Sequence, residues 1–222
     1  LLEACRTLWN STVNKRMYLT GAIGSTCHGE AFTEDYDLPS DTAYAETCAA
    51  ISLAMFAARM QNLEPKAIYA DTVERAIYNG ILSGISMDGK AFFYENPLEI
   101  DPKFNDVNHS VNDKERFPIT ERLEVFGCSC CPPNVVRFIP SVSGMMYGEN
   151  EDTLFVHHYA ASEGKFGNTA ITQTTDYPAD GAITIRCVTD KKKLALRLPG
   201  WCQKFELNQP YPLKDGYAYI AL

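Results

Sequence analysis

The sequence predicts a mainly α-helical first part followed by part of an antiparallel β-sandwich, in a chain of 222 residues. Apolar residues recur at helical spacing in the first part, up to about residue 88. From Asp152 onward, short β-prone runs alternate with turn residues. We therefore expect a helical domain at 1–149 and a partial sandwich at 150–222.

Three helices are expected in the first part. The first runs through Asn14, and a glycine-rich loop begins at Gly21. Apolar periodicity then predicts helices over 49–60 and 67–82. Pro65 suits the start of the second of these, because proline is tolerated in the first turn of a helix.

A small β element is expected to follow. Asp88-Gly89 predicts a tight turn between two β-prone arms over 85–94, since glycine readily takes the positive φ of such a turn. Residues 101–120 are polar and predict an exposed loop. Residues 135–146 predict a further helix, kinked at Pro140.

The β-prone runs of the last part have the length and spacing of sandwich strands. They lie at 153–159, 182–187, 194–198 and 217–220.

Charge and hydropathy narrow the class of partner. The formal net charge is -8, and no basic run exceeds Lys191-Lys192-Lys193, which argues against nucleic acid and against an anionic membrane. The apolar run at 49–58 stops at Arg59, short of the roughly 20 residues of a membrane span. A small, neutral, polar molecule is the expected partner.

Cysteine usage and the chain start bear on compartment. The eight cysteines cluster instead of spacing evenly, which favours a reducing, cytoplasmic location over a secreted disulfide framework. The start at Leu1 lacks an initiator Met and a signal-peptide pattern, so we expect the numbering to begin within a domain.

The strongest chemical feature is the segment Cys128-Ser129-Cys130-Cys131-Pro132-Pro133-Asn134. Adjacent thiols followed by two prolines indicate a rigid, metal-binding loop, although a vicinal disulfide and simple burial remain alternatives. Cys128 is a spare thiol that could substitute for Cys130 or Cys131 as a metal ligand.

A carboxylate and a fourth thiol occur upstream in Glu46-Thr47-Cys48. Residues two apart on a helix point about 200° away from each other, so both can bind one metal only where the helix is irregular or starts late. With Cys130 and Cys131 they would complete a Glu-Cys-Cys-Cys set that suits tetrahedral zinc.

Two further groups are candidates. Glu30 follows a glycine loop, and contact with Ala31 and Phe32 would desolvate it as a general acid requires, the alternative being a solvated acidic loop. His157-His158 lies in a predicted strand, where at most one of the two side chains faces a given site. Packing is the alternative role for both histidines.

Seven short segments, in order along the chain, resemble the bacterial β-L-arabinofuranosidases of glycoside hydrolase family 127, long catalogued as a domain of unknown function. The resemblance spans nearly the whole chain and corresponds to the central portion of a family member. It implies the later helices of an (α/α)6 barrel followed by the first part of a β-sandwich. The segments lie at 20–25, 29–32, 35–39, 44–48, 74–80, 93–99 and 130–134.

The resemblance also implies chemistry. It implies a retaining, zinc-dependent glycosidase that releases L-arabinofuranose from β-L-arabinofuranosides of plant glycans, with Cys130 as nucleophile and Glu30 as general acid/base. Tyr94 is implied as a substrate contact, and His28, beside Glu30, is a second candidate. One departure is Ala22, which stands where a second glycine is common. The implied Zn2+ ligands are Glu46, Cys48, Cys130 and Cys131.

Two other hypotheses remain open. One is a noncatalytic zinc-stabilised or carbohydrate-binding module, and the other is a redox protein that uses the Cys130-Cys131 pair. A helix face left without a partner in the first part would expose apolar surface, so we also expect a homo-oligomer.

Overall fold

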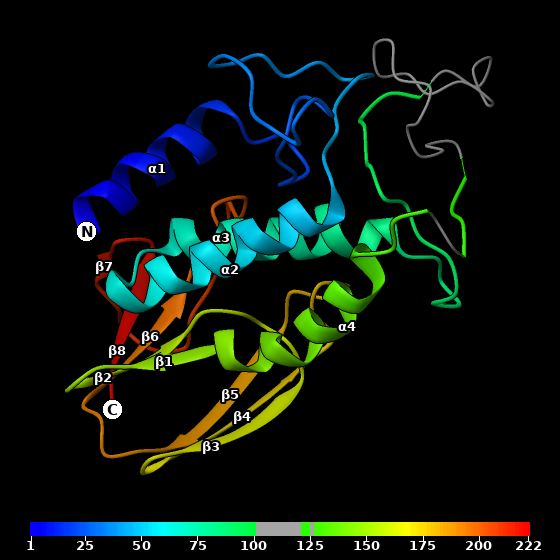
Figure 1. Cartoon of the computed structure of the whole chain (residues 1–222). Coiled ribbons are helices and arrows are strands. Elements are labelled where there is room, and N and C mark those ends of the chain that lie inside the picture. Colours follow the sequence, from blue (N-terminus) through cyan, green and yellow to red (C-terminus); the bar gives the residue numbers. More distant parts are fainter. Residues whose placement is uncertain (101–120, 125–126) are drawn as a thin grey trace. The chain divides into compact units, whose positions relative to one another are not determined.

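The structure, a computed structural model, describes residues 1–100, 121–124 and 127–222 (Figure 1). The exposed loop predicted at 101–120 lies outside these residues. The chain forms two compact units. The helical unit comprises Leu1–Met60 and Thr72–Pro140, and the sheet unit comprises Gln61–Asp71 and Ser141–Leu222.

The three helices predicted in the first part are present (Figure 1): α1 (Leu2–Lys15), α2 (Thr47–Leu63) and α3 (Ala67–Arg75). Most residues of α2 are Ala, Leu, Met and other good helix formers. Within the helical unit, the Trp9 ring meets the Phe56 ring edge-on at 5.8 Å and so packs α1 against α2. No helix of the described chain is both long and apolar enough to cross a membrane.

The helix predicted over 67–82 is continuous but changes type. After α3 it becomes a π-helix, η1 (Ala76–Ile81), and then a 3-10 turn, η2 (Leu82–Gly84). The glycine-rich loop touches the start of this π-helix, where a Cβ on Gly21 would lie 2.8 Å from the Ala76 backbone nitrogen. Only glycine permits this close approach, and its φ of +80° also favours glycine.

The predicted hairpin is reduced to a turn. Gly89 donates its N–H to the Ser86 carbonyl at 2.8 Å with a φ of 72°, as the Asp-Gly pair predicts. The two arms are not strands, because they pair only at the isolated bridge between Ile85 and Phe92. Phe92 instead forms a second bridge, with Leu123. The arm is thus shared between two partners.

The helix after the cysteine cluster starts earlier than predicted. The α4 helix runs over Cys131–Ser141, and the 3-10 helix η4 (Val142–Met145) follows it. Pro132 and Pro133 therefore lie in the first helical turn, where no backbone N–H is needed, and not in a preceding loop. Pro140 stands one residue before the end of α4, so the proline marks the change of helix type.

The sheet unit holds two sheets (Figure 1). The three-stranded sheet contains β3 (Ser162–Phe166), β4 (Thr169–Thr175) and β5 (Ile183–Val188), all antiparallel. The five-stranded sheet has the order β1 (Tyr147–Glu149), β2 (Thr153–Val156), β6 (Lys193–Arg197), β8 (Tyr217–Ala221) and β7 (Leu213–Lys214).

The prediction of a purely antiparallel sandwich is wrong for one pair, because β2 and β6 are parallel. The chain leaves the five-stranded sheet after β2, builds the three-stranded sheet, and returns with β6 in the same direction as β2. Such a crossover is what parallel pairing requires.

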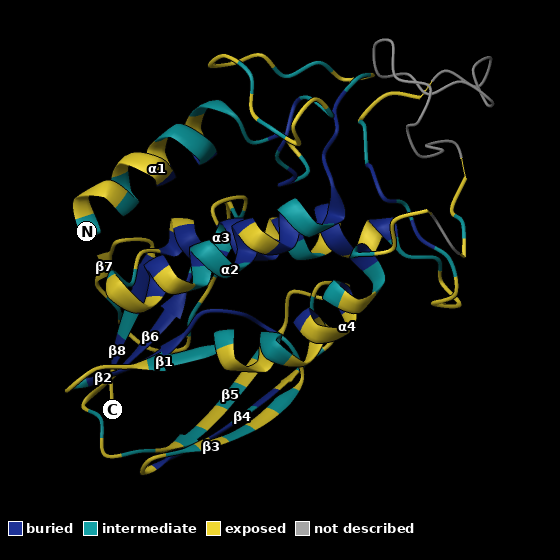
Figure 2. Ribbon diagram, viewed as in Figure 1, coloured by how far each residue is buried: buried dark blue, intermediate teal, exposed yellow. Residues whose placement is uncertain are grey.

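One apolar core joins the two sheets. It contains buried side chains of β2, β4, β6 and β8, with partly buried residues of β5 against them. Figure 2 shows the resulting patterns: β5 alternates along its length, whereas β2 is buried throughout. Period-two alternation is expected for a strand with one face on a core. The core is made by Leu154, Val156, Tyr159, Ile171, Leu194, Leu196 and Ile220.

The paired histidines belong to the interior of the sheet unit. His157 Nδ1 lies 2.8 Å from the Tyr217 hydroxyl, which accepts a hydrogen bond from Gln61 Nε2 at 2.7 Å. Burial, and secondly the charge of Arg197, lower the pKa of His157 to about 3. His158 is buried too. Packing is therefore the role that the structure supports for both, and neither belongs to the group of described side chains that could hold a metal ion.

Arg197 is the largest fully buried side chain of the sheet unit. Its guanidinium donates to the Asp71 carboxylate at 2.5 Å and to the His157 carbonyl at 2.5 Å. Asp71 also accepts the Gly200 N–H at 3.1 Å. A buried charge is tolerated only when paired in this way.

Candidate metal centre and active site

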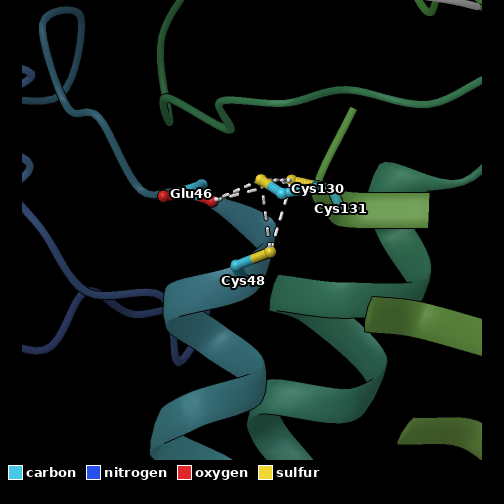
Figure 3. A group of neighbouring side chains, drawn as sticks. All are labelled: Glu46, Cys48, Cys130 and Cys131. Carbon is cyan, nitrogen blue, oxygen red and sulfur yellow. Dashed lines mark hydrogen bonds between the residues drawn. The ribbon is translucent and has the colours of Figure 1, made fainter. Parts of the chain in front are cut away.

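Four side chains of the helical unit meet in one cluster: Glu46, Cys48, Cys130 and Cys131 (Figure 3). One potential ligand atom of each lies within 4.8 Å of the others. Cys48 Sγ is 3.7 Å from both Cys130 Sγ and Cys131 Sγ, and those two sulfurs are 3.9 Å apart. The Cys130 thiol donates to Glu46 Oε1 at 3.3 Å.

The local backbone explains how Glu46 and Cys48 reach the same point. Helix α2 begins at Thr47, and the Glu46 carbonyl accepts the N–H groups of Ala49 and Ala50 at 3.0 and 3.1 Å. Glu46 is thus the cap residue just outside the helix, and Cys48 lies in its first turn. The late helix start that a shared site requires is therefore present.

A neighbouring segment holds this helix start in place. The backbones of Glu46 and Glu95 form a bridge, and the Thr47 N–H donates to the Tyr94 carbonyl at 3.1 Å. Asn96 donates its side-chain amide to the Ala45 carbonyl at 3.1 Å and to the Thr47 hydroxyl at 3.0 Å. These contacts connect the start of α2 to the segment that carries Tyr94.

The other two thiols lie at a second helix start. Asn134 donates its N–H to the Cys130 carbonyl at 3.2 Å, so Cys130 caps α4 and Cys131 is its first residue. All four cluster side chains therefore stand at helix N-termini, where the positive end of the helix dipole favours thiolates and carboxylates.

Tyr94 and Cys128 border the cluster. Cys130 Sγ lies 3.2 Å from the Tyr94 hydroxyl, and that hydroxyl donates to Cys128 Sγ at 3.8 Å. Cys128 is exposed and is not one of the four grouped side chains. All eight cysteines are free, so the vicinal disulfide alternative is absent from this structure.

Glu30 is linked to the cluster through a second tyrosine. Its Oε1 accepts a hydrogen bond from the Tyr44 hydroxyl at 2.9 Å, and the Tyr44 ring lies 6.2 Å from the Tyr94 ring. Glu30 and His28 are both exposed, so the desolvation by Ala31 and Phe32 expected for Glu30 is not seen. The sequence did not predict Tyr44 as the hydrogen-bond partner of Glu30.

The thiols differ in acidity. Hydrogen bonds, first from Cys131 and then from Asn134 and Cys130, lower the pKa of Cys48 to about 7. Burial raises the pKa of Cys130 to about 12, and hydrogen bonding with Cys48 followed by burial raises the pKa of Cys131. Hydrogen bonding thus eases ionisation of Cys48, whereas burial and hydrogen bonding oppose ionisation of Cys130 and Cys131.

The donor set fits a thiophilic divalent ion. Three sulfurs and one carboxylate oxygen are the ligand types and the number that tetrahedral zinc takes, and the softness of sulfur disfavours magnesium and calcium. The pKa values of Cys130 and Cys131 are raised, and a cation bound between the three sulfurs would stabilise their thiolate forms. Burial raises the pKa of Tyr44 and of Tyr94, so both phenols stay protonated near neutral pH.

Comparison with known families agrees with these features. Residues 1–144 match the β-L-arabinofuranosidase GH127 catalytic domain, and residues 153–221 match the β-L-arabinofuranosidase GH127 middle domain. The chain therefore belongs to glycoside hydrolase family 127, as the motif resemblance indicated.

Individual relatives are similar along the whole chain. A non-reducing end β-L-arabinofuranosidase of Bifidobacterium longum subsp. longum is 38% identical over 237 aligned positions, covering 100% of this chain and 35% of that protein. The crystal structure of a GH127 β-L-arabinofuranosidase from Geobacillus stearothermophilus T6 superposes with a TM-score of 0.86 at 41% identity, covering 99% of this chain and 36% of that one.

A further solved structure, a GH127 β-arabinofuranosidase, superposes with a TM-score of 0.83 at 34% identity, covering 100% of this chain and 37% of that one. The chain thus spans about a third of the length of the relatives it matches.

Proposed function

We propose that this protein is a retaining glycosidase that releases L-arabinofuranose from β-L-arabinofuranosides of plant glycans. The observation that carries the proposal is the meeting of Glu46, Cys48, Cys130 and Cys131 within 4.8 Å. Family membership and relatives named as β-L-arabinofuranosidases supply the sugar. We further propose that the helical unit is part of an (α/α)6 barrel and that the domain boundary lies near residue 150.

The cluster would hold Zn2+ through Glu46 Oε1 and the three sulfurs of Cys48, Cys130 and Cys131. When bound, the ion would supply positive charge that keeps buried thiols ionised near neutral pH. This role suits Cys130, because burial raises the pKa of its thiol and a protonated thiol is a poor nucleophile.

In the first step, Cys130 would attack the anomeric carbon with an electron pair on sulfur. The bond from that carbon to the leaving oxygen breaks, and the Glu30 carboxyl gives its proton to that oxygen. Glu30 is exposed, so a substrate oxygen has access to it. The sugar is then bound to Cys130 as a thioglycoside.

In the second step, the Glu30 carboxylate would take a proton from water while the water oxygen attacks the anomeric carbon. The carbon-sulfur bond breaks and the electron pair returns to Cys130. Two inversions at one carbon give net retention of configuration. Tyr94, whose hydroxyl lies 3.2 Å from Cys130 Sγ, and His28 are the proposed sugar contacts.

Elemental analysis of the protein, purified without added metal, tests the metal centre. We expect about one zinc per chain, lost in a Cys130→Ser, Cys131→Ser variant because two of four ligands are then gone. Cys187→Ser is the matched control, since this cysteine lies in β5 of the sheet unit. A folded, reduced protein without zinc would overturn the proposed centre.

Hydrolysis of aryl β-L-arabinofuranosides tests the chemistry. We expect turnover that falls at least ~100-fold in Cys130→Ala and in Glu30→Gln. Zinc bound at full occupancy, together with turnover in both variants that does not differ from that of the wild type, would favour the noncatalytic module. Self-association stays a prediction.

A further inference from the structure

The candidate acid/base, Glu30, has an exposed side chain in a loop. Glu30 is exposed and lies in a short loop closed by the backbone bridge between Thr26 and Ala31. Its own N–H donates to the Cys27 carbonyl at 3.2 Å, and its φ is 49°. An exposed glutamate has several rotamers open to it, whereas proton transfer needs one geometry.

Tyr44, by contrast, is fixed. Its side chain is only 5% exposed and packs in one apolar cluster with Phe92, Tyr94 and Cys131. Its neighbour Ala45 donates its N–H to the Gly24 carbonyl at 2.9 Å and accepts the Asn96 amide. The Tyr44 phenol is therefore held by packing, whereas the exposed Glu30 side chain is not.

The same phenol connects Glu30 to the cluster. Tyr44 donates to Glu30 Oε1 at 2.9 Å, its ring lies beside that of Tyr94, and the Tyr94 hydroxyl lies 3.2 Å from Cys130 Sγ. One line of side chains thus runs from the carboxylate to the thiol.

We propose that Tyr44 is a positioning residue that holds the Glu30 carboxylate at a set place relative to Cys130. This inference rests on the proposed function. Tyr44 keeps its own proton throughout: the proton that reaches the leaving oxygen comes from the Glu30 carboxyl as the bond from the anomeric carbon to that oxygen breaks. The hydroxyl fixes one carboxyl oxygen and leaves the other for the substrate.

Such a role gives a signature that depends on the leaving group. A poor leaving group, such as methanol, needs protonation as it departs, whereas 2,4-dinitrophenolate does not. Loss of the Tyr44 hydroxyl should therefore slow cleavage of the first kind of substrate and spare the second. A loss of nucleophilic reactivity at Cys130 would slow cleavage of both kinds of substrate equally.

The test compares Tyr44→Phe with Tyr18→Phe. Tyr18 is the matched control because it too is buried in the helical unit, and its hydroxyl has no hydrogen-bond partner among the described residues. The quantity to measure is kcat/KM, which reports the steps up to loss of the leaving group.

For Tyr44→Phe we expect kcat/KM to fall ~10 to 100-fold on the methyl glycoside and less than about 3-fold on the dinitrophenyl glycoside, with zinc content unchanged. Tyr18→Phe should match the wild type on both. Equal losses of Tyr44→Phe on both substrates, or no loss on either, would overturn the proposal.

A second readout is independent of activity. The side-chain carboxylate carbon of Glu30, labelled with 13C and assigned with Glu30→Gln, should change its NMR chemical shift in Tyr44→Phe but not in Tyr18→Phe. An unchanged resonance would refute the contact. A wild-type protein that cleaves neither glycoside but shows this shift would contradict the proposed function alone.

Discussion

Replacing Gly21 by alanine should destabilise the helical unit strongly. The added Cβ would lie 2.8 Å from the Ala76 nitrogen, 3.0 Å from the Ala76 Cα and 3.1 Å from the Arg75 carbonyl carbon. All three are backbone atoms at the junction of α3 and η1, so no side chain can rotate away. A left-handed φ costs alanine about 1–2 kcal/mol, and overpacking adds about 1–3 kcal/mol. The expected loss is about 2–5 kcal/mol.

Gly89→Ala is the control that separates the two terms. Gly89 has a similar φ of +72°, but a Cβ there would meet nothing within 4 Å, so only the conformational cost of about 1–2 kcal/mol applies. Urea unfolding followed by circular dichroism gives the free energy of unfolding of each variant. Equal losses in Gly21→Ala and Gly89→Ala would refute the argument that the backbone of η1 excludes a side chain.

Two further predictions concern the interior of the sheet unit. Buried His157 stays neutral in the folded protein until about pH 3, whereas the unfolded chain protonates it near pH 6.5, so stability present above pH 6.5 is lost as the pH falls. His157 should contribute about 1.4 kcal/mol per pH unit to the fall in the free energy of unfolding between pH 6 and 4. The free energy of unfolding of His157→Gln should therefore depend less steeply on pH, by this amount. The same pH dependence in the variant and the wild type would contradict the prediction. Asp71→Asn removes the charge partner of fully buried Arg197 and should cost about 3–5 kcal/mol. The exposed pair of Asp152 and Lys193 is the comparison, since solvent screens it and Asp152→Asn should cost far less than Asp71→Asn. Equal costs for the two variants would show that burial of the pair does not matter.

Local signals in the sequence were good guides where the cause is local. Helical periodicity placed α1 and α2 within a few residues of their observed bounds. The Asp-Gly pair marked a true turn at Gly89. The predicted start of α4 was wrong, because proline in a first helical turn and proline in a loop have the same local signature.

The pairing of strands in the sheet unit could not be predicted from local sequence signals. Alternation along β5 fits a strand with one half-buried face and one exposed face. It carries no information on which strand is its neighbour or in which direction, so the parallel pairing of β2 with β6 could not be predicted. Strand direction depends on how the chain crosses between sheets.

The sequence by itself determined the chemistry available to this protein: three thiols and a carboxylate in recognisable segments, and an order of motifs that defines its family. Only the tertiary structure decided that these groups meet, because Cys48 and Cys130 are separated by 82 positions and come together through two helix starts. The contact between Tyr44 and Glu30 also emerged only from the tertiary structure, because a hydrogen bond depends on the distance between two atoms in space and cannot be inferred from residue spacing.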